Sequence, residues 1–125
     1  MIEKTKSYYK NGKLEFDGEY LYTYKLRGKE FYLDGILEYE GKYLYNKKWE
    51  GKGYDKNGNI IYELKNGTGK VIEYYDGELF FEGEYLNGKR NGKGKEYFFG
   101  LLQYEGEYLN GKRNGKGKNI FGVVD

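Results

Sequence analysis

The clearest pattern along the chain is an alternation of aromatic or glycine positions with charged positions. Tyr104, Gly106 and Tyr108 alternate with Glu105 and Glu107. A period of two residues is typical of a β-strand, because successive side chains point to opposite faces of a sheet. The pattern therefore predicts strands with one aromatic face and one charged face.

This strand motif recurs throughout the chain as a tetrad of an aromatic residue, an acid, glycine, and then glutamate or lysine. The four intact tetrads begin at Phe16, Tyr39, Phe81 and Tyr104, at spacings of 23, 42 and 23 residues. A degenerate copy, Tyr62-Glu63-Leu64-Lys65, divides the long interval into 23 and 19 residues. Repetition at a fixed period indicates a repeat architecture. The predicted units lie near residues 16–38, 39–61, 62–80, 81–103 and 104–125, after a partial first unit at 6–15.

A glycine stands four residues before each tetrad and predicts a tight turn at that point. With the residue before it, the glycine forms the pairs Asn11-Gly12, Asp34-Gly35, Asn57-Gly58, Asp76-Gly77 and Phe99-Gly100. Asn-Gly and Asp-Gly are a strong signal for a type I′ turn, in which both central residues have positive φ. The pair Phe99-Gly100 breaks this rule, so we expect that turn to be looser or of another type.

Each unit is predicted to be one β-hairpin. In the last unit, the polar segment 110–115 has nothing to bury and is predicted to be a hairpin loop, and residues 117–121 return as the second strand. A single hairpin is marginally stable in water, so the units must stack edge to edge. We therefore expect one all-β domain over residues 1–125. Its fold would be a single elongated, twisted and curved antiparallel sheet of about ten strands, without a two-layer core.

The composition limits the chemistry that the chain can perform. Its 125 residues include 17 Tyr, 7 Phe and 21 Gly, but no Pro, His or Cys. Without His and Cys, the usual nucleophile–histidine pairs and zinc sites are excluded. Carboxylate pairs such as Glu82/Glu84 recur from unit to unit, whereas a catalytic pair would occur once. We therefore predict structural carboxylates, no enzymatic activity, no metal and no cofactor.

Charge and hydropathy give expectations about location and partners. No run approaches the roughly 18 apolar residues of a membrane span, and residues 1–10 lack the apolar core of a signal peptide. A cytoplasmic location is expected, with membrane or cytoskeletal association as alternatives. The net charge of +2 is too balanced to predict a nucleic-acid partner.

The segment FEGEYLNGKRNGKGKEYFFG, residues 81–100, resembles the MORN (membrane occupation and recognition nexus) repeat. That pattern is Tyr-Glu-Gly-Glu-Trp, then Asn-Gly-Lys, then Gly-x-Gly, then aromatic residues and Asp-Gly. The last two units match it almost residue by residue, and the resemblance spans about residues 6–121. Tyrosine replaces the frequent tryptophan of the family at Tyr20, Tyr43, Tyr85 and Tyr108. The resemblance implies a MORN-repeat array that acts as an adaptor, docks a helix or peptide along a groove, or self-associates.

Two sets of residues are candidates for binding. A single-layer sheet is not expected to bury all its rings, and exposed aromatic rows are typical of partner-binding surfaces. The residues expected to contact a partner helix or peptide in this aromatic groove are Tyr20, Tyr43, Trp49, Tyr85, Tyr97 and Tyr108. The residues expected to contact phosphate or an anionic lipid from adjacent loop tips are Lys89, Arg90, Lys112 and Arg113.

Three functional hypotheses follow from these sets. The first is a non-catalytic interaction or scaffold module, which could form a homodimer through the sheet ends because residues 120–124 are mostly apolar. The second is peripheral attachment to an anionic membrane through the basic loop tips. The third is a carbohydrate-binding module of aromatic–glycine hairpins, although the Gly-Trp pairs and secretion signal of such modules are missing.

Overall fold

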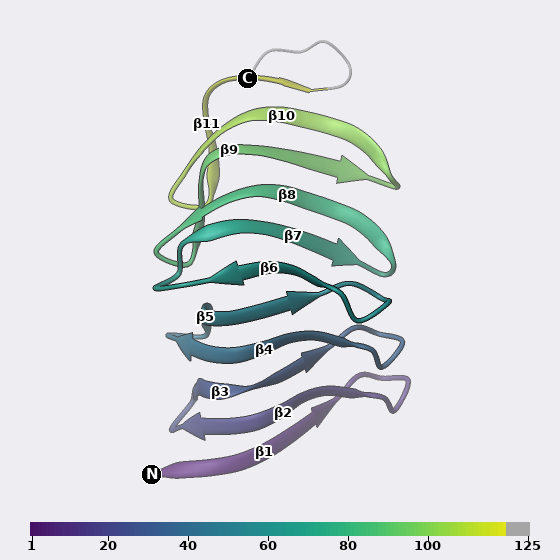
Figure 1. Cartoon of the computed structure of the whole chain (residues 1–125), viewed down its shortest axis with the longest axis vertical. Coiled ribbons are helices and arrows are strands. Elements are labelled where there is room, and N and C mark those ends of the chain that lie inside the picture. Colours follow the sequence, from purple (N-terminus) through teal and green to yellow (C-terminus); the bar gives the residue numbers. More distant parts are fainter. Residues whose placement is uncertain (120–125) are drawn as a thin grey trace.

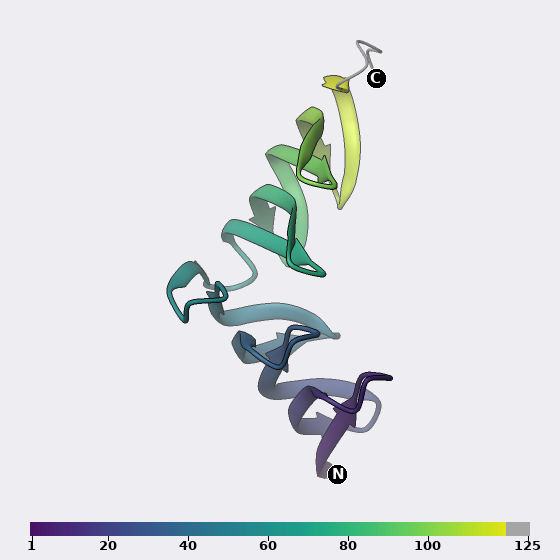
Figure 2. The same cartoon turned by 90° about the vertical axis from the view of Figure 1, so that its right-hand side faces the viewer.

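A computed structural model describes residues 1–119 as an array of antiparallel β-hairpins without a helix. The strands are β1 (Ile2–Tyr8), β2 (Leu14–Leu21), β3 (Tyr24–Phe31), β4 (Leu37–Leu44), β5 (Lys47–Tyr54), β6 (Ile60–Leu64), β7 (Gly69–Tyr75), β8 (Glu78–Leu86), β9 (Lys89–Phe98), β10 (Leu101–Leu109) and β11 (Lys112–Asn119). They stack in chain order, with the N-terminus at one end and β11 at the other (Figures 1 and 2). The predicted all-β class of tandem hairpins is confirmed.

The array is divided into two sheets rather than forming the single sheet that we expected. Strands β1–β6 form the first sheet and β7–β11 form the second. Between β6 and β7, an isolated bridge pairs Lys65 with Thr68 across the Asn66-Gly67 turn. The described residues therefore contain eleven strands, in sheets of six and five, instead of about ten in one sheet.

A column of glycines crosses the middle of each sheet. Paired glycines on neighbouring strands are Gly18, Gly28, Gly41 and Gly51 in the first sheet, and Gly83, Gly94, Gly106 and Gly117 in the second. At the junction, Leu64 and Val71 take the equivalent positions, and both are buried. The sheets therefore separate at the two strands where branched side chains replace glycine.

The aromatic residues of the tetrads fill the space over the glycine columns and form the core. Phe16, Tyr39, Phe81 and Tyr104 are at most 1% exposed, and neighbouring rings contact edge to face. Full burial of one large apolar side chain contributes about 1.5–3 kcal/mol. Val71 of the second sheet packs in the cluster that holds Phe16 and Tyr39, so the core continues across the break in hydrogen bonding.

The glycine turns adopt two conformations. At Asn11, Asp34 and Asn57 only the following glycine has positive φ, so the prediction of type I′ turns is wrong there. These longer turns are closed by bonds such as Tyr9 N–H to the Lys13 carbonyl, and in one of them Asn11 Oδ1 accepts a hydrogen bond from Lys13 N–H. This geometry suits a three-residue hairpin loop with glycine in the left-handed region. In Asp76-Gly77 and, against expectation, in Phe99-Gly100, both residues have positive φ.

The segment predicted to be a long loop is largely a strand. Asn110-Gly111 forms a two-residue turn with φ values of 51° and 89°, and β11 begins directly after it at Lys112. Asn87-Gly88 joins β8 to β9 in the same way. The polar sequence is compatible with a strand because each side chain alternates between the ring-covered face and the charged face.

Replacing Phe99 with asparagine is expected to stabilise the protein by about 1 kcal/mol, because a bulky residue in the left-handed region costs about 1–2 kcal/mol and asparagine tolerates it. Phe99 has φ 51° and is 77% exposed, so little burial is lost. Urea denaturation followed by circular dichroism measures the change. The matched control is Asp76→Phe in the neighbouring turn, which should lose a similar amount. Equal stability of wild type and Phe99→Asn would contradict the assignment of strain.

Candidate functional site

The face that carries the rings also carries a cation in each intact unit. Lys25, Lys48, Arg90 and Arg113 each stand nine residues after the first residue of a tetrad. They pair across the hairpin with Tyr20, Tyr43, Tyr85 and Tyr108. The cation then lies over the first ring of its own unit, at 3.9 Å from the ring centroid for Arg90 and Phe81, and at 5.2 Å for Lys48 and Tyr39. Cation–π attraction therefore helps to cover the rings.

Carboxylates on neighbouring strands neutralise these cations. In the second sheet, the Arg90 guanidinium lies 3.3 Å from Glu73 and 3.2 Å from Glu96. Arg113 donates from Nε to Glu96 at 2.6 Å. In the first sheet, the Lys48 ammonium lies 3.7 Å from Glu30 and 3.3 Å from Glu38. These ion pairs cover the ring face with a network in which positive and negative charges nearly cancel.

The network also fixes protonation states. Burial alone would raise the pKa of Glu30, but the Lys48 and Lys25 ammonium groups and the Tyr43 hydroxyl outweigh it and hold that pKa below its usual range. Burial would lower the pKa of Lys48, but Tyr62 and the carboxylates of Glu30 and Glu38 hold it above its ordinary value. Both groups are therefore charged at neutral pH and act as a structural ion pair.

The structure places the predicted aromatic contacts mostly inside the molecule. Tyr43 and Tyr108 are 5% and 3% exposed, and Tyr20 and Tyr85 are half-buried. The Tyr43 hydroxyl donates to Glu30 at 2.9 Å, and the Tyr85 hydroxyl donates to Glu73 at 2.7 Å. The expectation that this row forms an open groove is therefore wrong for Tyr43 and Tyr108, because the cations and glycine columns allow the rings to be covered.

Tyr97 and Trp49 do not belong to the ring row. Tyr97 lies on the charged face, where its hydroxyl donates to Glu82 at 2.6 Å. Burial and this hydrogen bond raise the pKa of Tyr97 to about 12. Trp49 packs on the turn between the two sheets. Its carbonyl accepts a hydrogen bond from Gly67 N–H at 2.7 Å, and its ring would lie 2.8 Å from a Cβ on Gly67.

The four basic residues expected on loop tips divide into two pairs. Lys89 and Lys112 are exposed at the starts of β9 and β11, next to the turns. The guanidinium groups of Arg90 and Arg113 instead lie over the rings of Phe81 and Tyr104. The expected position at a loop tip is wrong for these two arginines, so a row of four cations is not formed there. Both arginines stand nine residues after the first residue of a tetrad, and this interval was the sequence signal that could have assigned them to the ring face.

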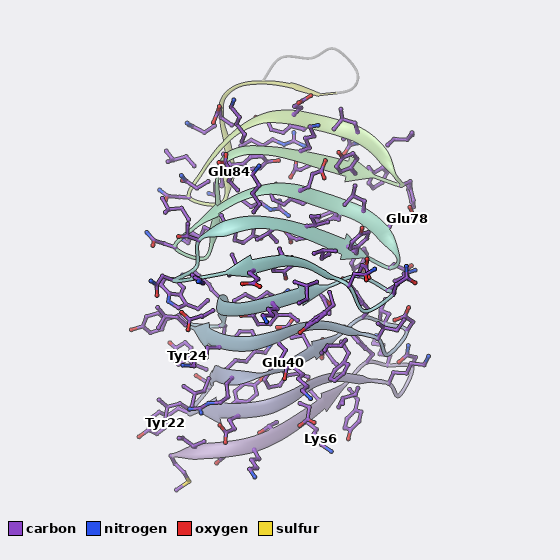
Figure 3. The ribbon with its side chains drawn as sticks, in the orientation of Figure 1. Lys6, Tyr22, Tyr24, Glu40, Glu78 and Glu84 are labelled. Carbon is purple, nitrogen blue, oxygen red and sulfur yellow. The ribbon has the colours of Figure 1, made fainter. Side chains whose placement is uncertain are left out.

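The charged face carries a groove that the sequence did not reveal. It has a volume of about 750 Å³ and crosses β7–β10, where the backbone of Gly83, Gly94 and Gly106 forms part of its lining. The other residues that line it are Ile61, Lys70, Val71, Ile72, Glu82, Glu84, Lys93, Lys95, Glu105 and Glu107. Lys6, Glu40 and Glu84, labelled in Figure 3, belong to this face in the two sheets. The groove is thus a concave surface on the charged face of the second sheet.

A smaller groove lies at the equivalent place in the first sheet. Its volume is about 380 Å³, and it is lined by Gly28, Gly41 and charged residues of β2–β4. Cross-strand ion pairs repeat in the two sheets, with 3.9 Å between Lys29 and Glu40 and 3.9 Å between Lys95 and Glu105. These side chains are about half exposed and remain accessible to another molecule.

Two kinds of feature are absent from residues 1–119. That region contains no group of three or more acidic side chains arranged to hold a metal ion. It contains no helix long and apolar enough to cross a bilayer. The apolar segment 120–124, expected to support dimerisation, lies outside the described residues.

The fold defines a class, the repeat proteins built from tandem β-hairpins. Residues 81–99 and 104–119 match the family model of the MORN repeat, so the chain carries MORN repeats in β8–β11. These matches confirm the resemblance inferred from the tetrads. A comparison with curated proteins gave no significant match. The MORN repeat is a module of protein or membrane interaction and is generally not catalytic.

Proposed function

We propose that this chain is a non-catalytic interaction module that binds a helix of a partner protein in the groove across β7–β10. The observation that carries the proposal is the groove itself, about 750 Å³ and lined by glycine backbone between charged side chains. The Cβ position of each of these glycines faces the rings, so on the charged face the floor of the groove is main chain between the flanking charged side chains. The ring face is less suited to this role, because its tyrosines are committed to the core.

The charges beside the groove favour a helical partner. Along one side, Lys70, Glu84, Lys93 and Glu107 follow one another on β7, β8, β9 and β10. The sign of the charge therefore alternates at the strand spacing of about 4.8 Å. A helix that crosses the strands advances about 5.4 Å per turn, so charges of alternating sign on successive turns would meet opposite charges. An extended peptide, at about 3.4 Å per residue, matches this spacing less well.

One end of the groove is apolar. Ile61 and Ile72 line it beside the β6–β7 junction, whereas the Val71 side chain is buried in the ring-face core. An apolar residue of the partner helix would fit here and would anchor the charged contacts. Buried apolar anchors within a charged rim are the usual arrangement of an affinity-determining interface.

Photo-cross-linking in the native host tests this proposal. A photoreactive amino acid replaces Lys95 in the groove or, as the matched control, Lys13 in an exposed turn of the first sheet. A protein adduct should form from the Lys95 position, should be absent from the Lys13 position, and should be lost when Lys93→Glu reverses the groove charge. Equal adducts from both positions, or adducts indifferent to Lys93→Glu, would rule out the groove as the binding surface.

A further inference from the structure

A second surface of the protein is apolar where most of its equivalents in the first sheet are polar. It lies on the turns that join β7 to β8 and β9 to β10, which lie at the same side of the sheet, where these strands end (Figure 1). These two turns are neighbours, because Glu78 Oε2 of one lies 3.4 Å from the position of a Cβ on Gly100 of the other. The exposed side chains of this surface, here called the Phe99 patch, are Tyr75, Phe80, Phe98, Phe99 and Leu101.

Phe99 occupies a conformation that its own contacts do not explain. Its φ of 51° is unfavourable for a bulky residue, and Asn or Asp stands just before the glycine in the other four turns of this edge. The ring is exposed and contacts Phe98 at 4.4 Å between centroids, so it adds nothing to the buried core. Strain retained at an exposed side chain indicates a binding role, since strained residues cluster at ligand contacts.

Acidic groups flank the patch. Asp76 lies in the first turn, and Glu78 follows it at the start of β8. The other acids of residues 71–88 lie elsewhere, because Glu82 and Glu84 line the groove and Glu73 pairs with Arg90, whose guanidinium lies 5.6 Å from the Phe80 ring centroid. The Lys56 ammonium approaches the patch from the first sheet, 2.7 Å from the position of a Cβ on Gly77. The local charge is therefore negative on balance, and a ligand with basic residues is favoured.

The spacing of the patch suits a helix. Its apolar side chains are grouped on two neighbouring hairpins, with Tyr75 and Phe80 on one and Phe98 and Phe99 on the next. Equivalent positions on adjacent hairpins are two strands apart, or about 9.6 Å. Residues seven apart on one face of a helix are separated by about 10.5 Å. Two apolar residues at that interval can therefore contact both hairpins at once.

We propose that the Phe99 patch binds a basic amphipathic helix of a partner protein. Its apolar residues would pack on Phe99 and Tyr75, and its Lys or Arg side chains would face Asp76 and Glu78. This surface is distinct from the groove, whose lining includes none of these residues.

The test uses a fluorescent peptide of about 14 residues, roughly four helical turns, with leucine and lysine at helical spacing. Fluorescence anisotropy with the full chain should show saturable binding. Phe99→Asn relieves the turn and keeps the fold, and it should weaken binding about tenfold or more. Asp76→Asn with Glu78→Gln should also weaken binding and reduce its dependence on salt. A peptide with serine in place of leucine should not bind.

Two variants locate the binding surface. Tyr22→Asn removes another exposed ring at positive φ, on the opposite edge of the first sheet, and should leave affinity unchanged. Lys95→Glu in the groove should also leave it unchanged. The proposal would be overturned if the peptide did not bind, or if Phe99→Asn bound it as tightly as wild type. It would also be overturned if Tyr22→Asn or Lys95→Glu lost as much affinity as Phe99→Asn. Analytical sedimentation of the chain without peptide tests a different occupant. If the wild type is a dimer and Phe99→Asn is a monomer, the patch binds a second copy of the chain and the proposal is overturned.

Discussion

Replacing Gly41 with alanine is expected to destabilise the first sheet by about 3 kcal/mol or more, which is a large part of the stability of a small domain. A Cβ at this position would lie 2.6 Å from Gly51 Cα and 2.8 Å from the Tyr39 hydroxyl oxygen, and would also collide with the Glu50 carbonyl oxygen. The hydroxyl has little freedom to move, because it donates to the Lys42 carbonyl at 2.9 Å. Relief would require separation of β4 from β5 or displacement of a buried ring. Urea denaturation of the two proteins measures the loss.

Gly58→Ala is the matched control for this prediction. Gly58 has φ 81° and nothing within 4 Å of its Cβ position, so only the cost of the left-handed conformation, about 1 kcal/mol, should appear. If Gly41→Ala loses no more stability than Gly58→Ala, the explanation is wrong. Glycine would then not be required at position 41 by the close approach of the ring, the carbonyl and the neighbouring strand.

The protein is expected to lose its fold cooperatively as the pH rises from about 10 to about 12, with loss of the native circular dichroism. An unperturbed tyrosine has a pKa of about 10. Burial, with Glu38 and other nearby carboxylates, raises the pKa of Tyr9 to about 12, and burial with Glu82 raises that of Tyr97 to about 12. Burial, reinforced by Glu30 and Glu73 respectively, also raises the pKa values of Tyr43 and Tyr85.

The raised pKa values determine the direction of this dependence. A folded pKa above the unfolded value means that the folded state retains its protons at a pH where the unfolded chain has lost them. The tyrosine contribution to stability is therefore fully present below pH 10 and falls as the pH rises towards 12. The raised pKa of Lys48 acts in the same direction.

Tyrosinate absorbance and far-ultraviolet circular dichroism, recorded on the same samples, test this expectation. Both signals should change together in one step, because unfolding exposes the ring hydroxyls to ionisation. Gradual ionisation of the tyrosines with an unchanged dichroism spectrum would mean that the ring face is open to solvent.

The repeat period made most of the fold predictable. Tetrads spaced by 23 residues located the strands, and the Asx-Gly pairs located turns. The division into two sheets was not predictable. Leu64 replaces glycine in the degenerate unit, but this local change does not indicate that the regular hydrogen bonding between β6 and β7 is missing. Only the structure shows that Val71 meets the second glycine column, and that Leu64 and Val71 pack in one cluster across the break.

The candidate site was less predictable than the fold. Alternation assigns a side chain to a face, but it does not say how strongly a strand is curved or what covers that face. The burial of Tyr43 depends on Lys25 and Lys48, which cover the rings from the return strands. The groove depends on which charged side chains stand beside the glycines of β8, β9 and β10, a relation that only the register between strands defines. The Asp76-Gly77 signal was correct, while the rule against Phe99 failed because the hairpin geometry overrides residue preference.

The presence of one groove in each sheet has a consequence for the strength of binding. A partner with two recognition helices on one linker could occupy both grooves, which lie on either side of the β6–β7 junction. Once the first helix is bound, the second experiences an effective concentration of roughly millimolar for a short flexible linker. Avidity would then multiply two weak affinities, and selectivity would come from the length of the linker as much as from the sequence of either helix.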